Sequence, residues 1–182
     1  MTVIIVNFTI VMKKFIFLVL SFLAVNTMNA QKLISGDFSV LKSEKFLKVA
    51  WDYSETIIEK QYSESEWEKI RDPGEWENAK EEAMDVVLEN MNDALEKTTL
   101  RVVGLDRDFE VKYVLYIKPI ELDKKGNNRS DFILIEKETD KEVARLNIKG
   151  DGGHWGTLSN LLGDGFEESA RSVGKYIRKV LK

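Results

Sequence analysis

The sequence contains no cysteine and a single histidine. Without cysteine the chain can form no disulfide framework, thiol nucleophile, cysteine-rich zinc site or acylated lipoprotein cysteine. One imidazole also excludes any site that needs two. The 182-residue chain therefore lacks the parts for many classes of enzyme, and we expect it to hold no metal and no cofactor.

Acidic side chains are missing from the first 30 residues, whose only charges are Lys13 and Lys14. An apolar run follows over residues 15–25, and small or polar residues then lead to Ala30. A basic start, a short apolar run and a small residue at the end are typical of a secretory signal peptide. We therefore expect residues 1–30 to be removed on export.

The start of the leader is open to two interpretations. Met12 precedes the two lysines and is a more natural start than Met1, so residues 1–11 would be an upstream extension or a misassigned start. The alternative to cleavage is a retained membrane anchor, although the apolar run is short for crossing a bilayer. After cleavage, residues 31–182 would form a single domain with no stable membrane anchor.

The chain has 27 basic and 31 acidic side chains, and within residues 31–182 the basic ones are interspersed with acidic ones. No basic patch emerges that would attract a nucleic acid or an anionic membrane. Since 43% of the residues are apolar, one domain of this size can build its own core. We expect a folded acidic protein with no nucleic-acid partner.

Two segments near the start of the mature chain have the composition of β-strands. Residues 37–41 are rich in apolar residues, and residues 47–53 alternate apolar and polar side chains. We expect these to be the first two strands, joined as a hairpin through residues 42–45.

Two helices are predicted in the next part of the sequence. Ser63 and Glu66 have the spacing of a capping box, which predicts a short helix. Asp72 is the expected N-cap of a long amphipathic helix over about residues 73–97. The apolar positions of that helix recur every three or four residues, and we expect them to be buried: Trp76, Ala79, Ala83, Val87, Met91 and Ala94.

Strands return after this helix. They are predicted at 100–103, within the apolar stretch 109–122, and at 132–135 and 143–148, with a polar hairpin turn over 138–141. Apolar residues on both faces of the second segment indicate a central strand, in which Pro119 would weaken the pairing because it lacks an N–H.

A second amphipathic helix is expected to close the chain. Asp164 and Glu167 have the spacing of an acidic capping box, and its buried stripe would be Phe166, Ala170, Val173, Ile177 and Leu181. The order β-β-α-β-β-β-α favours an α+β two-layer sandwich, with two long helices on one face of a largely antiparallel sheet. A closed β-barrel with outside helices is the alternative.

The segment Gly150–Gly156 is the most distinctive local motif. Glycines before a helix can present backbone N–H groups to an anion, and a histidine and a tryptophan could add a hydrogen bond and a stacking surface. Gly152, Gly153, His154 and Trp155 are therefore the candidate ligand-binding residues. The segment matches neither common phosphate-binding motif, so a simple connecting loop is the alternative.

Large aromatic residues suggest a second kind of contact. Trp51 and Trp76 fall on apolar stripes and are expected in the core, whereas Trp67 and Trp155 lie in less regular surroundings and are expected to be exposed. Exposed aromatic rings can anchor a protein partner or stack on sugars. Trp67 is the candidate contact for a protein partner.

Several segments together resemble a group of uncharacterised exported proteins of Gram-negative bacteria. They are the sequence GDFSVLK at 36–42, WDYS at 51–54, the Pro73-Gly74 break before a tryptophan-bearing helix, and strand-like segments at 112–117 and 144–149. The resemblance implies secretion and a single α+β domain, and brings no known activity. The layout is also similar to α/β modules that help to assemble envelope complexes.

These observations favour an exported, non-enzymatic binding protein of the periplasm or cell surface that engages another envelope protein. A small-ligand or glycan-binding protein that uses Gly150–Gly156 is the alternative. A hydrolase with paired carboxylates is a third hypothesis, since that chemistry needs only two acids across a cleft. No residue pair satisfies a stated catalytic geometry, so we assign no catalytic residues.

Overall fold

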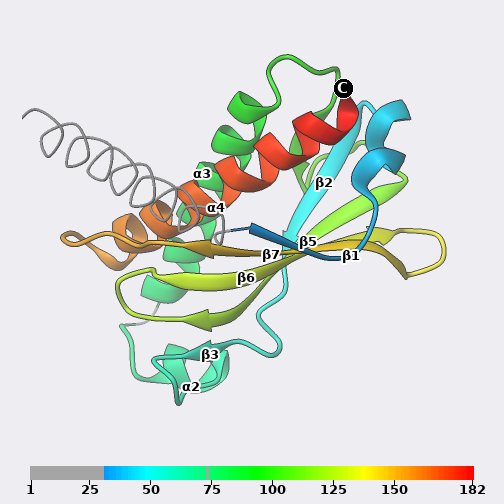
Figure 1. Cartoon of the computed structure of the whole chain (residues 1–182). Coiled ribbons are helices and arrows are strands. Elements are labelled where there is room, and N and C mark those ends of the chain that lie inside the picture. Colours follow the sequence, from blue (N-terminus) through cyan, green and yellow to red (C-terminus); the bar gives the residue numbers. More distant parts are fainter. Residues whose placement is uncertain (1–30, 73) are drawn as a thin grey trace, which may run out of the picture. The chain divides into compact units, whose positions relative to one another are not determined.

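The computed structural model describes residues 31–182 except Pro73 (Figure 1). The predicted signal peptide over residues 1–30 lies outside the described residues. The elements in chain order are β1 (Gln31–Gly36), the 3₁₀ helix η1 (Phe38–Ser43), β2 (Phe46–Trp51), β3 (Ile57–Ile58), α2 (Glu64–Lys69), α3 (Glu75–Ala94), β4 (Arg101–Gly104), β5 (Tyr113–Leu122), β6 (Asn128–Glu136), β7 (Lys141–Gly150) and α4 (Leu158–Leu181). None of the helices in this described part is long and apolar enough to cross a membrane.

The predicted α+β sandwich is confirmed. Seven strands form one open sheet in the order β1-β7-β6-β5-β2-β4, with β3 beside β5. The long helices α3 and α4 pack against each other and cover one face of this sheet (Figure 1). Most of the strand pairing is antiparallel, through β1–β7, β6–β7 and β5–β6. The pairings of β2 with β4 and β5, and of β3 with β5, are short and parallel.

The predicted strand at 37–41 is wrong, because this segment forms η1. The Asp37 carboxylate caps the helix by accepting the backbone N–H of Ser39 at 2.8 Å. Phe38 and Leu41 are three residues apart, so a 3₁₀ turn places both on the buried side. The predicted hairpin through 42–45 is therefore also wrong.

Of the predicted N-caps of α2 and α3, the first is confirmed and the second is wrong. The capping box of Ser63 and Glu66 is confirmed at the start of α2. The predicted N-cap Asp72 of α3 is wrong: Gly74 takes this position in the left-handed region, at φ 82°, without a side-chain cap. The predicted stripe of α3 is buried throughout, and this helix ends at Ala94.

The predicted start of the last helix at Asp164 is also wrong. Helix α4 begins two turns earlier, where the Thr157 hydroxyl accepts the backbone N–H of Asn160 at 3.3 Å. Gly165, in this early part of α4, has a packing role. A Cβ atom on Gly165 would lie 2.0 Å from the carbonyl oxygen of Gly126 in the β5–β6 turn. Glycine therefore allows α4 to approach that turn.

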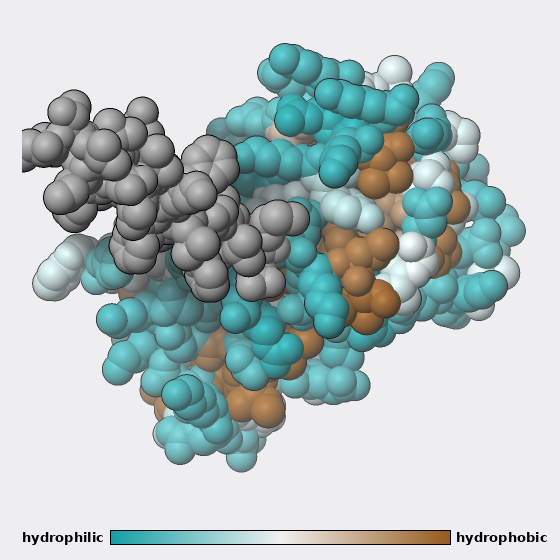
Figure 2. Space-filling model, viewed as in Figure 1, coloured by the Kyte–Doolittle hydropathy of each residue, from teal (hydrophilic) through white to brown (hydrophobic). Residues whose placement is uncertain are grey.

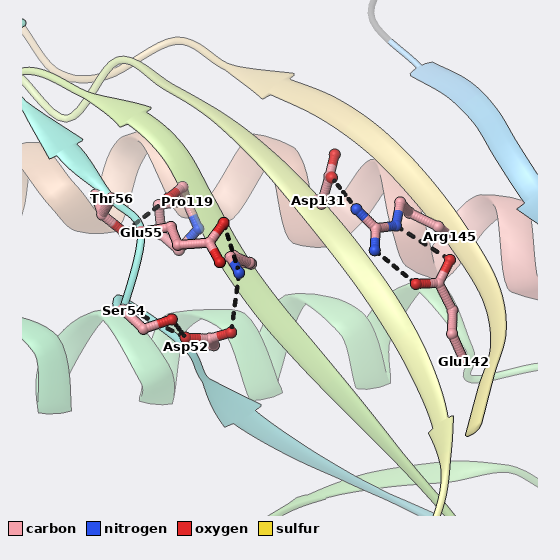
Figure 3. Close-up of polar contacts among 9 residues, drawn as sticks. Asp52, Ser54, Glu55, Thr56, Pro119, Asp131, Glu142 and Arg145 are labelled. Atoms are coloured by element: carbon pink, nitrogen blue, oxygen red, sulfur yellow. Dashed lines mark hydrogen bonds and ion pairs between the residues drawn. The ribbon is translucent and has the colours of Figure 1, made fainter. Parts of the chain in front are cut away.

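The predicted weakening of pairing near Pro119 is confirmed by a register shift between Pro119 and Glu121. Strands β2 and β3 lie along the same edge of β5, and the chain leaves the sheet between them. In this gap the Thr56 hydroxyl donates a hydrogen bond to the Pro119 carbonyl at 2.7 Å (Figure 3). The interruption places Tyr53 outside the strands, where it packs against α3.

Charged side chains on the sheet face opposite the helices are paired with one another. Arg145 lies between Asp131 at 3.0 Å and Glu142 at 2.5 Å (Figure 3). Lys118 contacts Asp52 at 3.5 Å and Glu55 at 3.1 Å. Each of these two clusters combines one cation with two carboxylates, so each keeps one excess negative charge.

Candidate functional site

A groove of about 740 Å³ lies between α3 and the ends of β2 and β4. Helix α3 forms one wall, and the segments that follow the two strands form the other. Because β2 and β4 run parallel, their carboxyl ends meet at one edge of the sheet, which is where ligands commonly bind in parallel sheets. The groove is lined by Val49, Ala50, Trp51, Tyr53, Glu64, Glu77, Lys80, Glu81, Met84, Asp85, Leu88, Gly104, Leu105 and Asp106.

Negative charge dominates this groove. Its five carboxylates come from Glu64, Glu77, Glu81, Asp85 and Asp106, whereas its only cation is Lys80. Lys80 pairs with the first two. Glu81, Asp85 and Asp106 are exposed and form no ion pair with another described residue. A cleft lined by charge of one sign concentrates ligands of the opposite sign.

Aromatic rings form the floor of the groove. The rings of Trp51 and Tyr53 have centroids 5.4 Å apart, and Tyr53 meets Trp76 edge to face, also at 5.4 Å. The Trp51 indole N–H donates to the Lys80 carbonyl oxygen at 3.2 Å, and its ring contacts Phe166 of α4. The floor is therefore held rigidly by both long helices.

The Lys80 ammonium lies in the groove among two carboxylates and two aromatic rings. Its Nζ is 2.7 Å from Glu64 Oε1 and 2.7 Å from Glu77 Oε1. It is also 5.5 Å from the centroids of the Tyr53 and Trp76 rings. Burial lowers the pKa of Lys80, but hydrogen bonds to the two carboxylates outweigh burial and leave this pKa above its ordinary value. The ammonium thus stays charged. We call these four surrounding residues the Lys80 site.

The Tyr53 hydroxyl is an unusual feature of this site. The side chain is only 6% exposed, and its hydroxyl has no hydrogen-bond partner among the described residues. Burial raises the pKa of Tyr53 well above its ordinary value, and the nearby charges of Glu64 and Glu77 raise it further. A buried hydroxyl left without a partner costs about 1–3 kcal/mol. This hydroxyl is therefore a buried donor and acceptor that no described residue satisfies.

A second hollow, of about 550 Å³, lies between β3 and the β5–β6 turn. Cations and anions are mixed there, and Arg129 already pairs with Glu121 at 2.7 Å. It therefore has no charge preference comparable to that of the first groove. Among residues 31–182 other than Pro73, no group of three or more acidic or histidine side chains is arranged to hold a metal ion.

Comparison with known proteins finds no matching family model and no matching curated protein. Among solved structures, the PelC dodecamer from Paraburkholderia phytofirmans aligns with a TM-score of 0.42 and 15% identity, over 78% of this chain and 96% of that one. A point variant of the same protein gives 0.40 and 16%, over 84% and 98%. Protein XCC0632 from Xanthomonas campestris, of family DUF330, gives 0.34 and 10%, over 75% and 84%. These scores do not establish a shared family.

The glycine-rich segment singled out in the sequence lies apart from the groove. The Gly152 N–H donates to the Asn127 side-chain oxygen at 2.8 Å, and the Asp151 N–H donates to Glu168 at 3.0 Å. Two of the backbone donors available for an anion are therefore already in use. A Cβ atom on Gly152 would lie 1.8 Å from the Lys125 carbonyl oxygen, so this glycine is needed for close packing.

The neighbouring candidates in this segment differ in exposure. Gly153 is buried, where a Cβ atom would lie 2.4 Å from the Asp164 carboxylate. His154 is exposed. The predicted exposure of Trp155 is confirmed, since 90% of the residue is accessible. The segment thus presents two exposed rings beside a tightly packed backbone.

The predicted exposure of Trp67 is wrong, because only 3% of this residue is accessible. Its ring packs against Tyr62 at a centroid distance of 5.8 Å. The Arg71 guanidinium, one helical turn further on, covers the ring at 4.1 Å. Trp67 therefore closes the core beneath α2, and its ring is not available to a protein partner.

Sequence reasoning missed the groove, although a signal was present. Glu77, Glu81 and Asp85 recur every four residues, which places three carboxylates on one face of α3. A charged helix face usually contacts only solvent, so this spacing does not by itself indicate a groove. The aromatic floor and the hydroxyl of Tyr53 depend on packing between distant segments, which the pattern does not show.

Proposed function

We propose that the protein is an exported, non-catalytic binding protein of a Gram-negative envelope, and that its groove receives a basic segment of another envelope protein. The observation that carries this proposal is the charge of the groove, in which five carboxylates and one lysine surround an aromatic floor. Complementary charge of this kind steers a basic partner to its site and selects against acidic ones.

The shape of the groove supports a protein segment as the occupant. Lysine and arginine side chains have long apolar stems and charged ends, so they can lie over aromatic rings while their charges meet carboxylates. The apolar side chains Met84, Leu88 and Leu105 in the walls would contact such stems. The remaining apolar side chains that reach the surface are scattered, and Figure 2 shows them as separate areas among hydrophilic ones on the side in view.

Binding to a defined basic peptide tests this proposal. A twelve-residue peptide of alternating lysine and serine is titrated into the exported protein and followed by calorimetry, beside the same peptide with glutamate in place of lysine. We expect only the lysine peptide to bind, and to bind more weakly as salt is raised, because exposed charges are screened. The double substitution Glu81→Lys and Asp85→Lys is expected to weaken binding at least about tenfold.

The matched control lies on the same helix. Glu82 and Glu89 are exposed residues of α3 that do not line the groove, so Glu82→Lys with Glu89→Lys makes the same change in net charge elsewhere. We expect this control to bind the peptide within about twofold of the unmodified protein. Equal losses in both double variants, or no binding of the lysine peptide, would refute the groove as the binding site.

A second candidate function rests on the exposed ring of Trp155. An indole that is 90% accessible next to a histidine can stack on a sugar ring, so the Gly150–Gly156 segment remains our alternative proposal for a small ligand or glycan. This alternative requires neither the acidic groove nor a basic peptide, and the two functions therefore predict different binding sites.

A further inference from the structure

We infer that the Lys80 site is a recognition site for a primary alkylammonium group, and that a lysine of the partner takes the place of the Lys80 ammonium when it binds. This inference rests on the proposed function, because the Lys80 site is part of the groove. The charge of the groove indicates only that the ligand is cationic, whereas this inference specifies its chemical group. It also means that Lys80 fills the site with the protein's own ammonium group when no partner is bound.

The first argument is the surrounding chemistry. The Lys80 Nζ atom contacts one oxygen of Glu64 and one of Glu77, both at 2.7 Å, and lies over two aromatic rings. Carboxylates together with ring faces are how proteins bind alkylammonium ions. The site therefore already holds such an ion, supplied by its own chain.

The second argument is the count of hydrogen bonds. An ammonium group has three N–H donors, and that of Lys80 donates to two carboxylates. The Tyr53 oxygen is buried, is affected by the charges of the same two carboxylates, and has no hydrogen-bond partner among the described residues. Because this oxygen is closed off from the groove, a ligand ammonium can donate to it only once the site opens, as displacement of the Lys80 side chain would allow; donation to Glu64, Glu77 and Tyr53 would then use all three donors. The ligand would then satisfy a polar group that Lys80 leaves unsatisfied.

The third argument distinguishes lysine from arginine. Both carboxylates meet Lys80 through a single oxygen, and Glu64 Oε1 also accepts the Trp76 indole N–H at 3.1 Å. Guanidinium groups bind carboxylates best with two parallel hydrogen bonds to both oxygens. Contacts through one oxygen of each carboxylate suit the compact ammonium group instead. A lysine of the partner also has the same unbranched alkyl chain as Lys80, so it would fit the space that the Lys80 side chain leaves.

Displacement of Lys80 is feasible because its side chain is not sealed in the core. This side chain is 16% exposed, and the unpaired carboxylates of Glu81 and Asp85 line the groove beside it. The displaced ammonium can therefore move toward other carboxylates instead of losing all of its partners. The exchange of one ammonium for another leaves the charge of the site unchanged.

Chemical rescue with n-butylamine tests this inference directly. Lys80→Ala removes the internal ammonium and its alkyl chain, and we expect the variant to melt at a lower temperature than the unmodified protein. Millimolar n-butylamine is then expected to restore several degrees of this loss, since a ligand that binds the native state stabilises it. n-Butylguanidine and n-butanol should restore less than half as much, and Lys175→Ala, an exposed lysine of α4, should not respond.

Two further measurements separate a recognition site from a structural ion pair. We expect Lys80→Ala to bind the lysine peptide about tenfold more tightly than the unmodified protein, because the internal competitor is gone. Tyr53→Phe removes only the unpartnered hydroxyl, and in the Lys80→Ala background it should weaken rescue by n-butylamine several-fold. If Lys80→Ala does not fold, Lys80→Met keeps the alkyl stem and serves for the peptide measurement.

Three results would overturn the inference. They are absence of rescue by n-butylamine, equal rescue by n-butanol, and peptide affinity that is unchanged or lower without the Lys80 ammonium. Each would make Lys80 a structural ion pair. The proposed function would survive any of them if Glu81→Lys with Asp85→Lys still weakened peptide binding and its control did not.

Discussion

Gly165→Ala is expected to destabilise the protein by about 3 kcal/mol or more, at or beyond the upper end of what overpacking usually costs. The added Cβ would lie 2.0 Å from the carbonyl oxygen of Gly126 and 2.9 Å from its carbonyl carbon. Gly126 has little room to move, because it packs closely against two segments: its own Cβ position is 1.9 Å from the Leu161 carbonyl oxygen of α4, and a Cβ atom on Gly152 would lie 2.5 Å from the Gly126 carbonyl carbon. Backbone therefore meets backbone at each of these contacts, and α4 would have to separate from the β5–β6 turn.

Gly163→Ala is the matched control for this prediction. It makes the same substitution in the same helix, where the nearest described atom outside the adjoining helix backbone would be a Val86 methyl carbon, in ordinary contact at 3.6 Å. Alanine is the better helix former by about 0.5–1 kcal/mol, so this variant should be as stable as the parent or more stable. Urea unfolding of both variants provides the measurement. Similar midpoints for the two would show that α4 does not approach the turn this closely.

Trp76→Ala is expected to cost about 3–5 kcal/mol, the usual range for removing a large aromatic side chain from a core. Trp76 is 1% exposed and packs edge to face against Tyr53. Its indole N–H also donates to Glu64 at 3.1 Å, so the substitution leaves that carboxylate with one partner fewer. The cavity would lie directly behind the floor of the groove.

The control for this prediction is Trp155→Ala, the same chemical change at a position that is 90% exposed. It should alter the free energy of unfolding by no more than about 0.5 kcal/mol. Denaturant unfolding followed by circular dichroism compares the two variants. A loss at Trp155 equal to that at Trp76 would contradict the described packing of both residues.

The sequence predicts the helix-on-sheet architecture because two apolar stripes recur at helical spacing. Every residue predicted for the stripe of α3 is buried, and Phe166, Ala170, Val173 and Ile177 of α4 are buried too. Capping residues predicted the local structure less reliably than the apolar stripes did. Asp37 caps a 3₁₀ turn in a segment whose composition favours a strand, and Asp164 and Glu167 have the spacing of a capping box although the N-cap of α4 is Thr157.

The candidate site could be predicted only in part, because it depends on contacts between segments distant in sequence. The carboxylates of α3 are visible as a spacing of four residues, but nothing local shows that β2 ends beneath them. Trp67 illustrates the converse, since an irregular sequence context concealed a ring that Arg71 and Tyr62 cover. Burial of single residues outside regular stripes is decided by tertiary packing.

Backbone and indole NMR signals recorded during titration with the lysine peptide test the central claim most directly. We expect the largest shifts in the first half of α3, at the end of β2 and at Gly104–Asp106, together with the indole N–H signals of Trp51 and Trp76. The indole signal of Trp155 should stay in place. Shifts concentrated at Gly150–Gly156, or spread over the opposite sheet face with the groove unaffected, would contradict the assignment of this groove as the binding site.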